Sequence, residues 1–173
     1  MGSKWLGLGM LAVLLLGAAS VRAQDTDPVT AELTIFRVAG DAEGNETLTP
    51  VTEIALGDIV EYQVVYTNRT NTPIQQLSPL LPIPGELVFL PQTALPVSVL
   101  ASTDGDRFAV VPLTELVVLP DGTKEEHPVP YSQYRILKWE IGTLNAGSSI
   151  QVRARMQVGE GLLSQNRAAA PGK

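Results

Sequence analysis

One segment, 56–70, constrains the fold more than any other part of the chain. A Gly-Asp turn signal opens it, and the residues that follow alternate between apolar or aromatic and polar side chains. One face carries Val60, Tyr62, Val64 and Tyr66, and the other carries Glu61, Gln63 and Thr67. A period of two is typical of a half-buried strand, and turn-favouring residues end it. We predict a central strand that buries Tyr62 and Val64 and exposes Glu61 and Gln63.

Two later segments show the same alternation. In 134–141, the residues Leu137, Trp139 and Ile141 point inward, and Arg135, Lys138 and Glu140 point largely outward. The segment 150–158 alternates most regularly between apolar and polar side chains. The apolar face carries Ile150, Val152, Ala154, Met156 and Val158, and the polar face carries Gln151, Arg153, Arg155 and Gln157. We predict that both are strands. Trp139, Ile141, Val152 and Ala154 should be buried, and Arg153 and Arg155 exposed.

Shorter strands fill the rest of the chain. β-Branched and aromatic runs bounded by turn residues predict strands at 29–38, 74–77, 86–90, 96–101, 108–111, 116–119 and 123–127. The last two flank Pro120-Asp-Gly, a hairpin turn signal. The segment 47–54 is expected to be a short strand or an extended connection. Prolines at 79, 82 and 84 make 78–85 an extended or edge crossover, because proline cannot donate to a ladder.

The strand pattern favours one fold class. Outside the N-terminal apolar run no window has helical periodicity. The chain has 13 prolines and 15 glycines, and most of them interrupt the strands. Many short strands with regular turns indicate an all-β sandwich of about seven to nine antiparallel strands. A barrel would need more uniform strands. We predict a single domain over 29–169, with a polar lead-in at 24–28 and a disordered tail at 170–173.

The N-terminus has the pattern of a secretory signal peptide over 1–23. A short basic start precedes an apolar run from Trp5 to Ala19, and Val21-Arg22-Ala23 places small residues where a signal peptidase reads. The apolar run is shorter than the roughly 20 residues that a membrane span needs. We predict export by the Sec route to the periplasm, the cell surface or the medium, and no transmembrane segment in the mature chain.

Charge and cysteine content exclude several classes of function. Without Lys4 and Arg22 the chain keeps 10 basic and 18 acidic residues, a net charge of −8, which argues against nucleic acid as a partner. The chain contains no cysteine. Disulfides, thiolate catalysis, thiolate zinc sites and iron–sulfur clusters are therefore excluded, and the domain must be stabilised by its core.

Three segments together resemble a bacterial repeat domain. Leu56-Gly-Asp-Ile-Val-Glu-Tyr-Gln-Val-Val-Tyr-Thr-Asn68 resembles its Gly-Asp turn, aromatic strand and closing Asn. Lys138-Trp-Glu-Ile-Gly-Thr-Leu-Asn-Ala-Gly147 resembles its Trp, Gly-x-Leu and turn glycine, and Asn166-Arg-Ala168 its final strand. The family is the domain of unknown function eleven. The resemblance implies an immunoglobulin-like sandwich in a secreted or cell-surface protein, and it implies no catalytic residues.

No residue stands out as catalytic, cofactor-binding or metal-binding. His127 is the only histidine, and a lone histidine beside a hairpin cannot build a conventional zinc site or serve a nucleophile motif. The acidic loops at 41–45 and 104–106 lack the spacing of a calcium loop and are expected to form turns. Tyr131 and Tyr134 are the aromatic residues that we expect at the surface, whereas Tyr62, Tyr66 and Trp139 are expected in the core.

Two functions of different kinds fit these observations. The first is a non-catalytic module of the cell envelope or cell surface that contacts other envelope proteins through sheet edges or loops, without a cofactor. The second is a periplasmic ligand-binding module for a glycan or calcium. The equipment for acid–base or covalent catalysis is missing, so we expect no enzymatic activity.

The signal peptide generates the first testable prediction. Val21-Arg22-Ala23 is the best cleavage site in the chain, so the exported protein should begin at Gln24. N-terminal sequencing of the protein recovered from the cell envelope or the medium checks this. A membrane-bound protein that keeps Met1 would show that the apolar run is an anchor.

Overall fold

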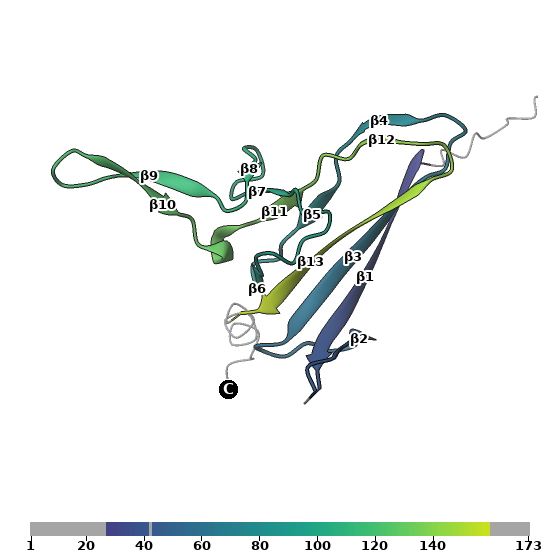
Figure 1. Ribbon diagram of the computed structural model, residues 1–173, viewed down its shortest axis with the longest axis horizontal. Coiled ribbons are helices and arrows are strands. Elements are labelled where there is room, and N and C mark those ends of the chain that lie inside the picture. Colours follow the sequence, from purple (N-terminus) through teal and green to yellow (C-terminus); the bar gives the residue numbers. More distant parts are fainter. Residues whose placement is uncertain (1–26, 42, 160–173) are drawn as a thin grey trace, which may run out of the picture.

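A five-stranded antiparallel sheet is the largest element of the molecule, and the segment singled out above forms its central strand, β3 (Ile59–Asn68). The computed structural model describes residues 27–41 and 43–159 (Figure 1). The order of strands in the large sheet is β2-β1-β3-β13-β6. Its other members are β1 (Val29–Gly40), β2 (Glu46–Pro50), β13 (Ser149–Val158) and β6 (Leu87–Phe89).

A second, four-stranded antiparallel sheet has the order β5-β11-β7-β8. Its strands are β5 (Leu80–Pro82), β11 (Ile136–Lys138), β7 (Leu100–Ser102) and β8 (Ala109–Val110). Two separate ribbons complete the described fold. One pairs β4 (Ile74–Leu77) with β12 (Gly142–Leu144), and the other pairs β9 (Thr114–Val118) with β10 (Lys124–Pro128).

The all-β prediction is confirmed. Within residues 27–41 and 43–159 the only helical element is a single 3-10 turn, Tyr131–Gln133. No helix in this part of the chain is long and apolar enough to cross a membrane. The predicted signal peptide (1–23), most of the 24–28 lead-in, the strand at 166–168 and the 170–173 tail lie outside the described residues.

Side chains from both sheets meet in one core. The alternating face of β13 contributes Val152, Ala154 and Met156, all fully buried. The four-stranded sheet contributes Leu81 and Leu137. The predicted burial of Val64, Trp139, Val152 and Ala154 is confirmed, and Tyr62 and Ile141 are half-buried against the same cluster.

Trp139 connects the two layers of the core. Its side chain is fully buried, and its Nε1–H donates a hydrogen bond of 2.8 Å to the carbonyl of Pro96. Its backbone N–H donates to the carbonyl of Pro79 at 3.0 Å. Because a buried indole N–H needs an acceptor, the ring position and the course of the chain at Pro96 depend on each other.

Tyr134 was expected at the surface, and that expectation is wrong. Its side chain is fully buried, its ring lies 5.1 Å from that of Tyr131, and its hydroxyl accepts a 2.7 Å hydrogen bond from the backbone N–H of Leu113. Burial raises the pKa of this hydroxyl, so it stays protonated. A tyrosine can be buried when its polar end finds a partner, and here the partner lies 21 residues away.

The polar faces of β3 and β13 also differ from expectation. Glu61 is 1% exposed, and Gln63, Arg153 and Arg155 are half-buried instead of exposed. The antiparallel register sets Arg155 opposite Glu61 and Arg153 opposite Gln63. These side chains cover one another because opposite charges on neighbouring strands attract across the sheet.

Several strands are shorter than predicted. The 134–141 segment does not form one strand. Its strand β11 ends at Lys138, and the chain continues into β12, which pairs with β4. Gly142 has a φ of +80° at this change of direction, a conformation that glycine adopts readily. The 96–101 strand shrinks to β7, and the 47–54 segment is a strand only where it belongs to β2, whereas the Pro120-Asp-Gly hairpin forms as predicted.

The core generates the second testable prediction. Replacing Trp139 by alanine leaves a large cavity and an unpaired Pro96 carbonyl, so we expect a loss of about 3–5 kcal/mol in unfolding free energy. Urea denaturation of the purified domain measures this. Trp139→Phe keeps an aromatic ring and should lose less. An alanine variant as stable as the parent would contradict the burial of this ring.

Candidate binding groove

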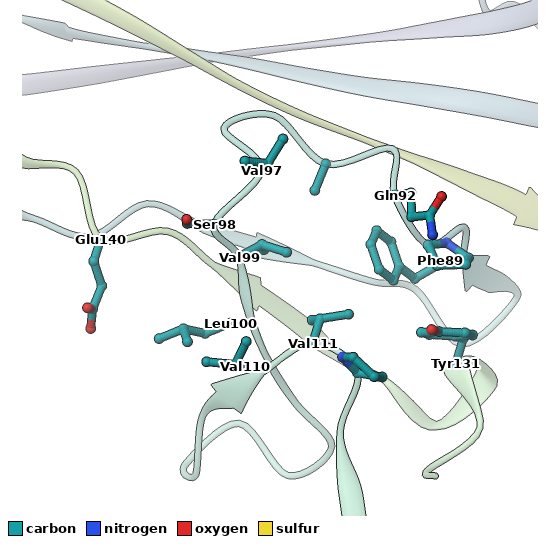
Figure 2. Close-up of a pocket in the computed structure, with 13 residues that line it drawn as sticks. Phe89, Gln92, Val97, Ser98, Val99, Leu100, Val110, Val111, Tyr131 and Glu140 are labelled. Atoms are coloured by element: carbon teal, nitrogen blue, oxygen red, sulfur yellow. The ribbon is translucent and has the colours of Figure 1, made fainter.

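An apolar groove of about 790 Å³ lies between the loop that follows β6 and the β7–β8 edge of the four-stranded sheet. Figure 2 shows Phe89 and Tyr131 at one end, Glu140 at the other, and Val99 and Val111 between them. A volume of this size is typical of pockets that hold small ligands or peptide side chains.

One wall of the groove is the loop that follows β6, which is hydrogen-bonded to the large sheet. Beyond β6 the chain continues along the edge of β13, where the backbone N–H and C=O of Leu95 both bond to Arg153 at 2.8 Å. Thr93 adds a bond from the N–H of Arg155 to its hydroxyl at 3.0 Å. Pro91 and Pro96 keep this segment from forming a regular strand. The loop is therefore irregular but firmly attached.

The opposite side of the groove belongs to the four-stranded sheet. Pairing of β7 with β8 extends to Val99 and Val111, whose backbones are joined by a hydrogen bond of 3.4 Å. β8 is the last strand of its sheet. The groove thus lies where the edge of one sheet comes close to a loop carried by the other.

The rim of the groove, formed by Val97 and Val110, is apolar and exposed to solvent. Val97 is 78% exposed and Val110 is 71% exposed. Among the described residues that line the groove, Glu140 is the only charged one, and its carboxylate lies 3.7 Å from the Lys138 ammonium. Exposed apolar side chains around a concave apolar surface are typical of sites that bind an apolar partner.

The aromatic end of the groove is closed. Phe89 is 1% exposed, and its ring packs edge-on against Tyr131 with centroids 6.0 Å apart. Tyr131 is itself half-buried. Phe89 is therefore inaccessible to a sugar, and Tyr131 is only partly accessible.

His127, the histidine considered from sequence, and Ser149 are not among the residues that line this groove. His127 is exposed on β10, with its Nε2 3.3 Å from a carboxylate oxygen of Glu125, as expected of a solvated hairpin residue. The Ser149 hydroxyl pairs with that of Thr67 at 2.7 Å. The structure does not bring these side chains together with one another.

The acidic loops form turns. The Asp104 carboxylate accepts bonds from the N–H groups of Arg107 and Asp106 and from the Ser102 hydroxyl, and these hold its pKa well below its usual range. Asp41 is engaged similarly with Asn45. Among residues 27–41 and 43–159, no group of three or more acidic or histidine side chains is arranged to hold a metal.

A second cluster of polar side chains lies behind the groove wall, on the outer face of the large sheet. The buried Glu61 carboxylate accepts bonds from Arg155 Nε at 2.8 Å, Arg153 Nη1 at 3.2 Å and Gln63 Nε2 at 2.6 Å. Arg155 also bonds both carboxylate oxygens of Glu46, at 2.8 and 2.7 Å. Two arginines and two glutamates thus neutralise one another.

The electrostatics of this cluster favour the charged form of Glu61. Burial by itself raises the pKa of the Glu61 carboxyl, but the hydrogen bonds from Arg155 and Gln63 and the charge of Arg153 outweigh burial and lower the pKa. Hydrogen bonds to the carboxylates of Glu46 and Glu61 raise the pKa of Arg155. Because all of these groups already have partners, we interpret the cluster as a stabilising device and not as a ligand site.

Comparison with known proteins adds no relative: no protein-family model, curated protein or solved structure matches the chain. The groove is therefore the feature of the molecule that bears on its function. The sequence did not predict the groove because its lining comes from separate stretches of the chain, around Phe89, Val99, Val110, Tyr131 and Glu140. The only local signal was the clustering of prolines at 91, 96 and 112 around short strands.

The Glu61 cluster generates the third testable prediction. Glu61→Gln removes the charge but keeps the shape, and we expect it to cost about 1.5–3 kcal/mol at neutral pH, the usual worth of hydrogen bonds to a charged group. Since the folded pKa of Glu61 is lowered, its stabilisation is present above the unfolded pKa and is lost as the pH falls through the folded value.

Denaturant titrations at neutral and acidic pH test this. The stability difference between the parent and Glu61→Gln should shrink on acidification. Gln157, on the same strand and face as Arg155 but exposed, supplies a control as Gln157→Ala, which should change stability little at either pH. A difference that is unchanged by acidification would contradict the assignment.

Proposed function

We propose that this chain is a non-catalytic, exported envelope or cell-surface module that binds an extended apolar segment of another envelope protein in the groove. The observation that carries the proposal is the groove itself: it is apolar, Val97 and Val110 at its rim are exposed, and Glu140 is the only charged residue among the described ones that line it. Such a surface recognises apolar side chains, and it holds no acid–base pair for chemistry.

An extended segment suits the groove because β8 has a free edge. The hydrogen bond from the N–H of Val111 to the carbonyl of Val99 makes these two residues a bonded pair. In an antiparallel ladder the next pair, Leu100 and Val110, is not bonded, so the backbone N–H and C=O of Val110 point away from β7. A partner strand can bond there while its alternate side chains enter the groove.

The alternative ligands fit less well. A glycan platform needs exposed aromatic faces, whereas the aromatic rings of the groove are buried or half-buried and already packed on each other. Calcium needs free oxygen ligands, whereas the carboxylates of Asp41 and Asp104 are occupied by bonds within their own turns. Both remain outcomes of the test below.

We further propose that the fold is an immunoglobulin-like sandwich related to the domain of unknown function eleven. Two antiparallel sheets that share one core support this. Two residues that carry the resemblance have clear structural roles in this chain: Trp139 is buried in the core, and Gly147 makes its turn at a φ of +67°. The proposed relationship to this family and the sequence pattern of the signal peptide support export.

In-cell photocrosslinking tests the function. A photoreactive residue at Val97 should crosslink one envelope protein, and mass spectrometry should place the crosslink in an extended apolar stretch of it. A synthetic peptide of that stretch should bind the domain with one-to-one stoichiometry, and Val110→Asp should abolish binding. Leu33, an exposed apolar residue on β1, is the control position for both the crosslinker and the aspartate.

Two results would overturn the proposal. One is equal crosslinking from Val97 and Leu33, which would mean that the groove is not selective. The other is the absence of any crosslink together with saturable binding of a glycan or calcium in calorimetry, or hydrolysis of a polysaccharide.

A further inference from the structure

The β9–β10 hairpin is an arm that projects away from both sheets (Figure 1). Nine of its ten strand residues are exposed, and Val117 is half-buried. Leu116 is 65% exposed and Val118 is 62% exposed. An isolated two-stranded hairpin is only marginally stable in water. The arm therefore has an apolar strand with nothing in the described chain packed over it, and it gains stability if more strands join it.

The two edges of the arm can be distinguished from its hydrogen bonds. Leu119 donates to Thr123 at 2.8 Å and Val129 donates to Leu113 at 2.9 Å, so these two pairs, and every second pair between them, are the bonded ones. The intervening residues point their backbone groups outward. They are Thr114, Leu116 and Val118 on β9, and Lys124, Glu126 and Pro128 on β10.

The β10 edge is protected against further pairing. Pro128 has no N–H to donate, and Lys124 and Glu126 place charges beside the other outward groups. Charged residues and proline are the usual means by which an edge strand avoids pairing. The β9 edge has no such protection: its outward residues are Thr114, Leu116 and Val118, and Glu115 is the only charge on the strand.

We propose that the β9 edge pairs antiparallel with the β9 edge of a second copy of this chain, giving a four-stranded ribbon with the order β10-β9-β9-β10. In the register that we propose, Leu116 lies opposite Leu116 of the second copy and Thr114 lies opposite Val118. Every outward N–H and C=O of β9 then has a partner.

The charged residues of the arm do not oppose a second copy in this register. Glu115 lies opposite Val117, so no glutamate faces a glutamate across the new pairing. The acidic Glu125 and Glu126 of each copy stay on the outermost strands, far from each other. A two-fold pairing uses the same patch on both copies and leaves no free apolar edge, so association stops at the dimer. This surface shares no residue with the groove, so either proposal can fail without the other.

Introduced cysteines test the register directly. The chain has no cysteine of its own. In the full chain, purified as cells produce it, any disulfide formed by Leu116→Cys must therefore join position 116 of two copies. Paired strands bring opposite residues within disulfide range. We expect Leu116→Cys to form a disulfide-linked dimer under mild oxidation. Glu126→Cys, equally exposed on the outer strand of the same hairpin, should not.

Proline substitutions test the edge without touching the hairpin's own bonds. Leu116→Pro removes an outward N–H of β9, and Glu126→Pro removes an outward N–H of β10. Sedimentation over a concentration series should show a reversible dimer for the parent and for Glu126→Pro, and its loss for Leu116→Pro. Circular dichroism and urea denaturation confirm that both variants keep their fold.

Three results would overturn the proposal. The parent could sediment as a monomer at every concentration. Leu116→Cys could crosslink no better than Glu126→Cys. Finally, in-cell crosslinking from Leu116 could yield a species with a different protein, such as one offering a basic strand to this acidic arm, which would assign the edge to another partner.

Discussion

The antiparallel pairing of β3 with β13 is the interaction on which the rest of the structure depends. It joins residues far apart in sequence, such as Glu61 and Arg155, which are 94 positions apart. One face of the pair supplies Val64, Val152 and Ala154 to the core, and the other holds the buried glutamate and its arginines. Moving the register by one residue would put arginine into the core and valine into solvent, so hydrophobic burial and ion pairing select the same register.

The groove follows from this pairing. The free edge of β13 receives β6 and then the loop that bonds to Arg153, and that loop becomes the wall of the groove. The opposite side comes from the other sheet. Trp139 connects the two, because its indole is buried in the core and donates to the carbonyl of Pro96 at the end of the wall. Core packing and groove shape are therefore coupled through one side chain.

The β9–β10 arm is held by local contacts and not by packing between the sheets. Its register comes from a short turn, where the Asp121 carboxylate accepts bonds from both the N–H and the hydroxyl of Thr123 and Gly122 takes a φ of +84°. These are local contacts, and they need no support from the sheets. What the arm lacks is a covering layer. Its charge is concentrated on one strand and its apolar residues on the other, which leaves a single edge suited to association.

The sequence by itself determined the elements whose signal is local. Alternation of side chains predicted β3 and β13 and the burial of Trp139, and turn chemistry predicted the Pro120-Asp-Gly hairpin, since both depend on residues only a few positions apart. Only the tertiary structure decided that Glu61 and Tyr134 are buried and that a groove forms beside Val97 and Val110. Alternation separates two faces but does not say what covers each of them. A polar side chain becomes buried when a distant residue supplies its hydrogen bond, and a groove exists only where distant segments meet, so neither leaves a signal in a short stretch of sequence.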